Sequence, residues 1–211
     1  MTLFDLSHLL TPGMPVYPAD PEVSFTPDLT IAHDGVAVTA IAMGTHTGTH
    51  LDAPAHIDPD GLTVEQLDLE LLHGSAHIVH LLHPPQPAAR IRIEDLDHFP
   101  DQLPKIVCVA TGWDRHFYDP VSQQHPYLDP ALVKLCWQRG ARVLGIDTWS
   151  PDPSFTDTDL AVHQFWLGNG GIIVENLRNL TALPGQVQMS LLPLPLTGCD
   201  GAPVRAVAWR E

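Results

Sequence analysis

The sequence between His46 and His56 reads HTGTHLDAPAH, and it holds three histidines and one aspartate within eleven residues. Imidazole and carboxylate groups are the ligand types that suit zinc, manganese and iron. A lone histidine is usually structural, but four candidate ligands packed this closely favour a metal site. The candidate chemical centre of the chain therefore consists of His46, His50, Asp52 and His56.

These four residues all fall on even positions, and this parity predicts their local structure. Alternate side chains of an extended chain point to the same face, so all four are expected on one side, with Gly48 between them leaving room for an ion. The spacing of His46 and His50 also fits one face of a helix. The threonines, Gly48 and the following Pro54 disfavour a helix, however, so we expect a strand that runs into a tight loop.

Short apolar runs outside this segment predict buried strands. Residues 106–110 (IVCVA) and 143–146 (VLGI) are continuous apolar runs, as expected for strands that are covered on both faces. Further strand-like runs lie at residues 36–43, 76–81, 171–175, 187–192 and 204–209.

Helix signals are fewer. Residues 63–74 begin with a capping box and continue with leucines to a glycine. Residues 129–140 begin with an N-cap aspartate and a proline at the first helical position. A weaker pattern spans residues 157–166. Helices between short buried strands predict an α/β fold, and we expect residues 1–211 to form a single mixed domain.

The composition excludes several classes of protein. The chain has 25 acidic and 10 basic residues, which gives a net charge of −15 with histidine neutral. It therefore lacks a basic surface for nucleic acid or for an anionic membrane, and no apolar run is long enough to span a bilayer. The three cysteines are far apart, so no disulfide framework or zinc ribbon is expected. The first residues do not resemble a signal peptide, so we expect a cytoplasmic protein.

The segment HTGTHLDAPAH resembles the H-x-G-T-H-x-D-x-P-x-H motif of the cyclase family, which includes the bacterial kynurenine formamidases. Every fixed position of that motif is matched. His163 and Glu175 are similar to a histidine and a glutamate of the family in type and spacing. The resemblance covers nearly the whole chain, with further similar segments at residues 5–7, 15–18, 145–148, 192–194 and 202–206.

This resemblance implies a site for two divalent metal ions per subunit, with zinc as the first expectation and manganese as the alternative. His46, His50 and Asp52 would bind the first ion and His163 the second, while Asp52 and Glu175 would contact both. Glu175 follows an apolar run, where an unpaired carboxylate is costly and a metal ion would satisfy it. The implied fold is a swivelling β/β/α domain, assembled into homodimers or larger oligomers.

The implied activity is hydrolysis of an amide bond by metal-activated water, with His56 as the acid/base residue. Kynurenine formamidases hydrolyse N-formylkynurenine in tryptophan catabolism, so the expected partner is a small aryl amide. Tyr17 stands where those enzymes have a substrate-stacking tryptophan, and a tyrosine can also stack on an aryl ring.

Other interpretations of the sequence stay open. A cyclic amide such as isatin, or a lactone, is a second substrate class for the same family. A non-catalytic metal-binding module would keep the ligands but would need no proton carrier at His56, and a structural scaffold would bind no metal. The aromatic residues are equally open, because pocket and core positions fit each of Trp113, Trp149, Phe165 and Trp166.

Overall fold

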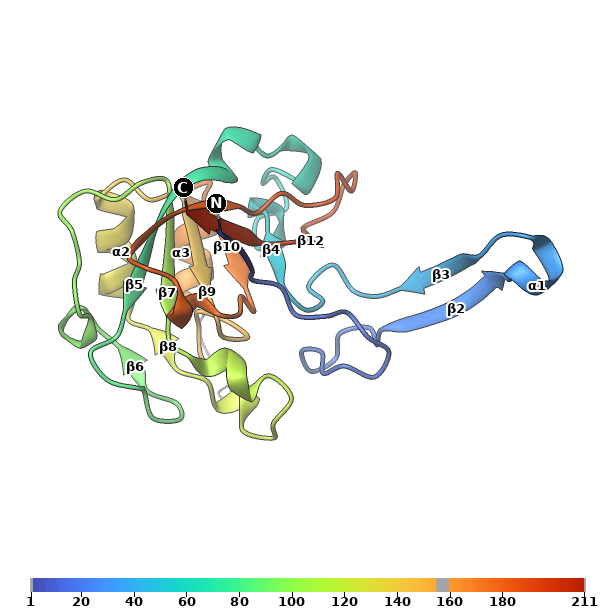
Figure 1. Ribbon diagram of the computed structural model, residues 1–211. Helices are drawn as coiled ribbons and strands as arrows, with labels where there is room; N and C mark the ends of the chain where they lie inside the picture. The colour runs from blue at the N-terminus through green and yellow to red at the C-terminus, as the bar shows by residue number, and fades with distance from the viewer. Residues whose placement is uncertain (1, 155–159, 211) are drawn as a thin grey trace.

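Figure 1 shows the computed structural model of the protein, which describes residues 2–154 and 160–210. A nine-stranded mixed sheet forms the body of the molecule, and its N-terminal and C-terminal strands pair at one edge. The strands follow the order β1 (Thr2–Asp5), β13 (Val207–Arg210), β11 (Gln186–Ser190), β5 (His73–His80), β7 (Ile106–Ala110), β9 (Val143–Ile146), β10 (Ile172–Glu175), β4 (His50–Asp52) and β12 (Gly201–Pro203).

The centre of this sheet is parallel, because β5 pairs with β7, β7 with β9 and β9 with β10 in the same direction. Every residue of β7 and β9 is buried, which explains why both sequences are continuously apolar. Both strands have the bounds predicted from the sequence. The strands expected at residues 76–81, 171–175, 187–192 and 204–209 are present as β5, β10, β11 and β13 with shifted ends.

Two α-helices cover one face of the sheet (Figure 1). α2 (Pro130–Gln138) follows Asp129, whose side chain accepts a hydrogen bond of 2.8 Å from the first turn, as predicted for its N-cap. α3 (Ala161–Gly168) contacts α2 and β10. The fully buried Trp166 fills the space beneath α3, and its Nε1 donates a hydrogen bond of 2.9 Å to the carbonyl of Ile172. This packing fixes the position of α3 on the sheet.

The sheet is curved, and a second hydrophobic core covers the face opposite the two helices. Leu51 of β4 and Ala208 of β13 come from opposite ends of the strand order, yet both belong to this core together with Ile78 and Ile106 from the centre. β4 pairs with β10 on one side and with β12 on the other, and all three of its residues are buried. The mixed α/β fold expected from the sequence is confirmed.

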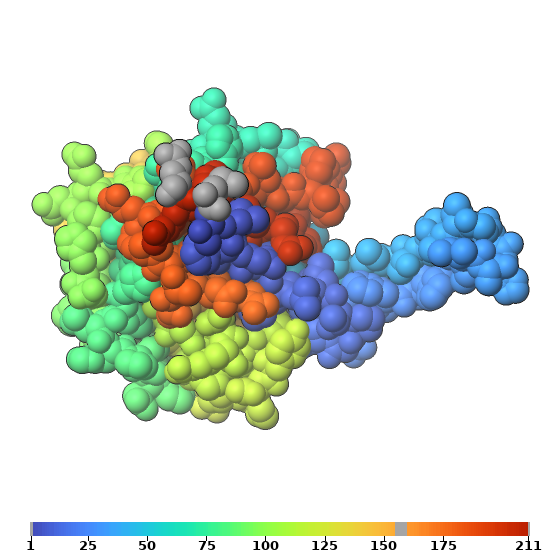
Figure 2. Space-filling view, in the orientation of Figure 1, coloured from blue at the N-terminus to red at the C-terminus, as the bar shows by residue number. Residues whose placement is uncertain are grey.

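A hairpin projects from the body as an arm, drawn in blue in Figures 1 and 2. Its strands β2 (Ser24–Leu29) and β3 (Val38–Ala42) are antiparallel, and α1 (Ile31–Asp34) lies at the tip. Every residue of β3 is exposed, as are the apolar side chains of Ile31 and Ile41 at 73% and 59%. The sequence predicts a strand here but gives no sign that it lies outside the core.

The helix expected over residues 63–74 is replaced by two 3-10 turns, Val64–Gln66 and Leu69–Leu71. The chain is extended at Leu67, with ψ of 141°, and this ends the first turn. Asp68 then caps the second turn by accepting a hydrogen bond from a backbone N–H two residues further on. Such local hydrogen bonds compete with a continuous helix, which is the physical reason for the difference.

The remaining elements are short. β6 (Arg90–Ile91) and β8 (Tyr127–Leu128) form a separate parallel pair. α3 begins at residue 161, and the earlier part of the helix expected from residue 157 lies mostly outside the described residues. Across the described residues, no helix has the length and apolar character to cross a membrane. Further 3-10 turns lie at Pro54–His56, Ile93–Asp95, Trp113–His116, Ser122–Gln124 and Leu180–Ala182.

Candidate active site

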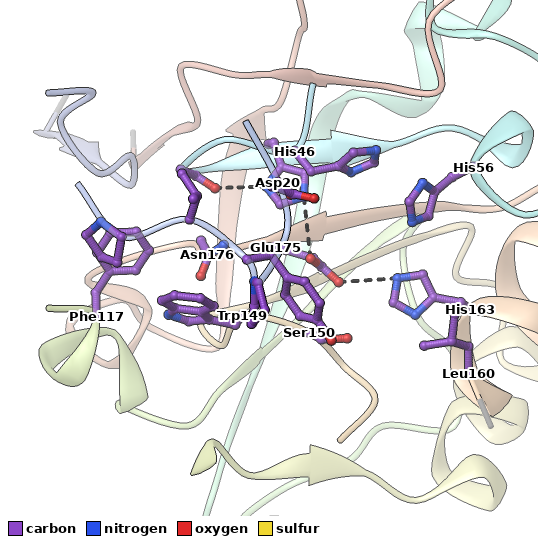
Figure 3. Close-up of a pocket in the computed structure, with 16 residues that line it drawn as sticks. Asp20, His46, His56, Phe117, Trp149, Ser150, Leu160, His163, Glu175 and Asn176 are labelled. Carbon is purple, nitrogen blue, oxygen red and sulfur yellow. Dashed lines mark hydrogen bonds and ion pairs between the residues drawn. The ribbon is translucent and has the colours of Figure 1, made fainter. Parts of the chain in front are cut away.

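A pocket of about 310 Å³ lies at the carboxyl ends of the central parallel strands (Figure 3). Glu175 ends β10, Trp149 follows β9 and Phe117 follows β7. This edge is the usual place for ligands in α/β sheets. The segment around β4, α3 and the base of the arm complete the lining, which consists of Pro15, Val16, Tyr17, Pro18, Asp20, His46, Gly48, His50, His56, Phe117, Trp149, Ser150, Leu160, His163, Glu175 and Asn176.

The register of β4 against β10 brings three polar side chains together. His50 lies directly opposite Glu175 in the antiparallel pair, and Asp52 lies two residues along β4, so all three share one face of the sheet. His50 Nε2 is 3.4 Å from Glu175 Oε2 and 3.3 Å from Asp52 Oδ1. All three side chains are buried, so they form the floor of the pocket.

His46 reaches this floor from a turn and not from a strand. The extended segment begins only at His50, so the shared parity of the motif does not place its residues on one face. Gly48 has a left-handed φ of +62°, and a Cβ there would lie 2.7 Å from Leu10 Cδ2. A glycine is therefore needed here for the left-handed turn and for the close packing of Leu10. The sequence analysis had instead expected it to leave room for an ion. Through this turn His46 Nδ1 comes within 2.7 Å of Asp52 Oδ1.

α3 contributes His163 to the floor. Its Nε2 lies 3.3 Å from Glu175 Oε1 and 3.6 Å from Asp52 Oδ2. Its Nδ1 is 2.8 Å from Asp152 Oδ2, and the Asp152 carboxylate also accepts backbone hydrogen bonds from Val162 and His163. Asp152 thus caps α3 and orients its histidine at the same time. This residue was not among the sequence candidates, because an aspartate between two prolines has no distinctive signal.

His56 lies between the floor and solvent. It ends the 3-10 turn Pro54–His56, and its ring centre is 4.1 Å from that of His46 and 5.8 Å from that of His163. Its Nδ1 is 3.1 Å from Asp200 Oδ2. Its side chain is 30% exposed, against 16% for His46 and at most 8% for the other side chains of the floor. His56 is therefore adjacent to the buried group without being part of it.

The floor contains buried polar atoms that form no hydrogen bond within the described part of the chain, although each lies 3.3–3.6 Å from a group that could pair with it as an ion. His50 Nε2, Asp52 Oδ2 and Glu175 Oε1 are buried and form no hydrogen bond with the described residues. A buried polar atom left unpaired costs about 1–3 kcal/mol, and more when the group is charged. Divalent cations between these atoms would satisfy all three, so the residues present fit metal binding.

The histidines that face the carboxylates are also oriented as metal ligands are. In protein metal sites, the ring nitrogen that does not bind the metal donates to a carbonyl or carboxylate, which fixes the tautomer and the ring. Each histidine of the floor has one nitrogen toward the carboxylates and the other against such an acceptor: His50 Nδ1 is 2.8 Å from Gly48 O, His163 Nδ1 is 2.8 Å from Asp152, and His46 Nε2 is 2.9 Å from Asp200.

The candidate ligand atoms of the described residues form three groups; one joins His46, His56 and Asp200, and the two groups on the floor share one carboxylate. One group joins His46 and His50 to Asp52, and the other joins His163 and Glu175 to Asp52, with the ligand atoms of each group within 4.8 Å of one another. A carboxylate with one oxygen in each group is suited to bridge two cations. The five side chains that the sequence analysis selected as metal ligands are thus brought together at one point.

The family model described as "Putative cyclase" matches residues 4–153 of the chain. The chain belongs to this family. It is 37% identical over 204 residues to the kynurenine formamidase of Geobacillus thermodenitrificans, with 96% of this chain and 94% of that protein covered. It is 31% identical over 207 residues to the kynurenine formamidase of Bacillus mycoides, with 96% and 95% covered. The resemblance carried by the motif at residues 46–56 is confirmed.

Solved structures show the same cyclase fold. A protein described as a potential metal-dependent hydrolase with cyclase activity is 27% identical, with a TM-score of 0.81 over 100% of this chain and 98% of that one. Isatin hydrolase A from Labrenzia aggregata is 22% identical, with a TM-score of 0.84 over 98% and 93% of the two chains. The second comparison establishes a shared fold alone, because its sequence identity is low.

Aromatic side chains form one wall of the cyclase-family pocket. The ring centre of Trp149 is 5.8 Å from that of Phe117 and 6.5 Å from that of Tyr17, and Figure 3 shows Trp149 and Phe117 on the same side. Phe117 was not a sequence candidate, whereas Tyr17 was and lies in the lining. Of the aromatic residues left open, Trp149 lines the pocket, Trp113 and Trp166 are buried in the core, and Phe165 packs partly buried beside α2.

Burial and the neighbouring charges shift the pKa values of the floor residues in opposite directions. Burial lowers the pKa of His50, but the carboxylates of Asp52 and Glu175 outweigh it and raise that pKa to about 10. His163 follows the same balance: burial lowers its pKa, and hydrogen bonds led by that of Asp152 hold the pKa well above its usual range. Burial raises the pKa of Asp52, whereas its histidine partners hold the pKa well below the ordinary value. Without a metal ion, the carboxylates thus favour the protonated form of both histidines.

Metal affinity is expected to fall as the pH falls, because a metal ion must displace the proton from His50, whose pKa in the metal-free site is about 10. Zinc binding at neutral pH should thus release at least about one proton per ion, measurable by calorimetry in buffers of different ionisation enthalpy. His50→Ala should lose bound metal in elemental analysis, and the exposed His83→Ala, outside the pocket, should keep it. Zinc binding without proton release would contradict this description of the floor.

Proposed function

We propose that the chain is a metal-dependent hydrolase that cleaves the C–N bond of an aryl formamide such as N-formylkynurenine, giving formate and the free amine. The observation that carries this proposal is the buried floor of histidine and carboxylate ligands with unpaired atoms beneath an aromatic wall. The near full-length similarity to proteins named kynurenine formamidase supports the substrate class. Residues 1–211 act in this proposal as one hydrolase domain.

Two divalent ions per chain are part of the proposal. His46 and His50 would hold one ion and His163 the other, and the carboxylates of Asp52 and Glu175 would complete both sites. Zinc is the proposed ion and manganese the alternative, because imidazole and carboxylate ligands accept either. Divalent ions held by these residues would supply a water molecule with a pKa near neutrality and a Lewis acid for the substrate carbonyl.

His56 supplies the proton transfer in this mechanism. Its Nδ1 faces Asp200, which leaves Nε2 to exchange a proton within the pocket. Amide cleavage needs a proton on the leaving nitrogen, because the amide anion is a poor leaving group. His56 takes a proton from the attacking water and delivers it to that nitrogen, which is the role of a general base followed by a general acid.

The aromatic wall orients the substrate. Tyr17, Trp149 and Phe117 present ring surfaces on which an aryl group can stack, and they exclude water from that side of the reacting carbonyl. Tyr17 is 38% exposed, so its ring is accessible to a ligand that enters the pocket. The site therefore offers separate places for the aryl ring and for the amide.

A cyclic amide such as isatin is the second candidate substrate. No lysine or arginine is among the described residues that line the pocket, so the carboxylate of N-formylkynurenine meets no cation from this chain. An uncharged ring does not need one. A non-catalytic metal-binding module explains neither the open aromatic pocket nor the position of His56 beside the ligand floor.

Metal-loaded protein is expected to hydrolyse N-formylkynurenine with kcat/KM above about 10⁴ M⁻¹s⁻¹, an ordinary value for a real substrate. Formation of the free amine can be followed by absorbance, with zinc and manganese loaded separately and isatin tested in parallel. Fast turnover of isatin alone would select the second candidate. Turnover of neither class by metal-loaded protein would overturn the hydrolase proposal.

His56→Ala is expected to keep its metal and to lose turnover by about 10²- to 10⁴-fold, because it removes proton transfer and leaves the floor intact. Elemental analysis and steady-state kinetics on the same preparation measure both properties. His83→Ala is the matched control, since it removes a histidine outside the pocket. If His56→Ala turned over at the wild-type rate, the acid/base assignment would be wrong.

We also propose that the arm joins copies of the chain into a homo-oligomer. Val36 and Val38 add to the exposed apolar surface of Ile31 and Ile41, and a lone two-stranded hairpin is only marginally stable in water. A second copy that covers this surface would stabilise the arm.

The double substitution Ile31→Glu and Ile41→Glu is therefore expected to convert an oligomer into monomers, because it places negative charge in the proposed contact. Light scattering coupled to gel filtration measures the mass. The control places glutamate at Leu82, which is 51% exposed on the body. A wild-type chain that is already monomeric, or an oligomer that survives both arm substitutions, would contradict the proposed contact.

A further inference from the structure

The Asp200 carboxylate contacts both His46 and His56. The main chain of Asp200 is fixed by hydrogen bonding beside β4, the strand that carries His50 and Asp52. It directly precedes β12, whose pairing with β4 sets Gly201 opposite Asp52. The carbonyl of Asp200 accepts a hydrogen bond of 2.8 Å from the backbone N–H of Ala53. The side chain of Asp200 therefore starts from a fixed point beside the pocket.

Three side chains hold the Asp200 carboxylate. Its Oδ2 lies 2.9 Å from His46 Nε2 and 3.1 Å from His56 Nδ1. Its Oδ1 accepts a hydrogen bond of 3.1 Å from Thr45 Oγ1. The side chain remains 41% exposed, so these contacts rather than burial determine its position. A single oxygen thus contacts both a proposed metal ligand and the proposed proton carrier.

The glycine that follows Asp200 makes this arrangement possible. A Cβ at Gly201 would lie 2.7 Å from His46 Cε1 and 2.8 Å from Leu51 O, which is closer than atoms of this kind approach. A residue without a side chain lets the His46 ring lie against the strand, within reach of the carboxylate. Asp200 and Gly201 therefore act together, since one binds the ring and the other leaves space for it.

A carboxylate at one ring nitrogen determines what the other nitrogen can do. Neutral imidazole carries its proton on either nitrogen, and a carboxylate accepts a hydrogen bond only from the nitrogen that is protonated. With its Nδ1 proton directed to Asp200, neutral His56 has a free lone pair on Nε2. That is the form that can accept a proton from water, whereas the opposite tautomer cannot accept one at Nε2.

We propose that Asp200 is a positioning residue that holds His56 with Nδ1 protonated and with Nε2 free to exchange a proton with the reacting atoms. This inference rests on the acid/base role proposed for His56. The same oxygen holds His46 with Nδ1 toward Asp52, so one carboxylate orients both the ligand and the proton carrier.

The first test observes the tautomer and needs no substrate. In zinc-loaded protein with ¹⁵N-labelled histidine, at about pH 8 where free histidine is neutral, long-range ¹H–¹⁵N spectra distinguish the two ring nitrogens. His56, assigned from the spectrum of His56→Ala, is expected as the Nδ1–H tautomer in the wild type and to shift toward Nε2–H in Asp200→Ala. Asp60→Ala, which removes an exposed carboxylate from a nearby turn, should leave the signal unchanged. An unchanged His56 signal in Asp200→Ala would overturn the proposal.

The second test separates positioning from a general structural effect. Asp200→Ala at saturating zinc is expected to lower kcat for N-formylkynurenine by about 10- to 100-fold with KM within about twofold, and Asp200→Asn, which keeps one acceptor, should lose less. At saturating zinc, which keeps His46 on the metal, adding Asp200→Ala to His56→Ala should cause almost no further loss, because the proton carrier that Asp200 positions is gone. Full multiplication of the two losses would show that Asp200 acts elsewhere.

Two further outcomes keep this inference distinct from the hydrolase proposal. If Asp200→Ala lost zinc while His56 kept its tautomer, Asp200 would serve the metal through His46 only, and the positioning role would be wrong. If the wild-type protein hydrolysed no amide, the hydrolase proposal would fail, and the histidine spectra would still decide whether Asp200 fixes the His56 ring.

Discussion

The carboxylates of Asp52 and Glu175 lie inside the sheet, where a charged group without compensation costs several kcal/mol. The neighbouring structure supplies that compensation from three directions. The pairing of β4 with β10 sets His50 opposite Glu175, the turn at Gly48 carries His46 to Asp52, and the capped start of α3 aims its histidine at both carboxylates. Even so, three buried atoms form no hydrogen bond with the described residues, and a divalent cation would satisfy them.

Much of this site can be predicted from the sequence, because its ligands are concentrated in one motif. The motif identified four residues of the centre within eleven positions, and the resemblance to the cyclase family added His163 and Glu175. The continuous apolar runs of β7 and β9 likewise predicted two strands covered on both faces, and every residue of both strands is buried.

The features that the sequence did not reveal depend either on contacts between distant segments or on local backbone geometry. Asp152 and Asp200 are ordinary aspartates until α3 and β12 bring them against histidines, and no local pattern reports such a contact. Parity failed for the motif because a left-handed glycine interrupts the extended chain before β4. The prediction of a helix over residues 63–74 was wrong because the side chain of Asp68 forms a local hydrogen bond that caps a 3-10 turn, despite the favourable pattern of leucines. Competing local contacts of this kind are not visible in periodicity alone.

The place of β4 between β10 and β12 also has a consequence for how the protein is made. The motif at residues 46–56 leaves the ribosome early, but the strands on either side of it end at residues 175 and 203. Until both have been synthesised, the motif has neither the carboxylate that faces His50 nor the one that faces His56. Before that point the nascent chain offers a metal ion the histidines of the motif but not the complete set of candidate ligands. A metal ion that needs this complete set of ligands would therefore bind after most of the sheet is in place, and it would stabilise the folded chain.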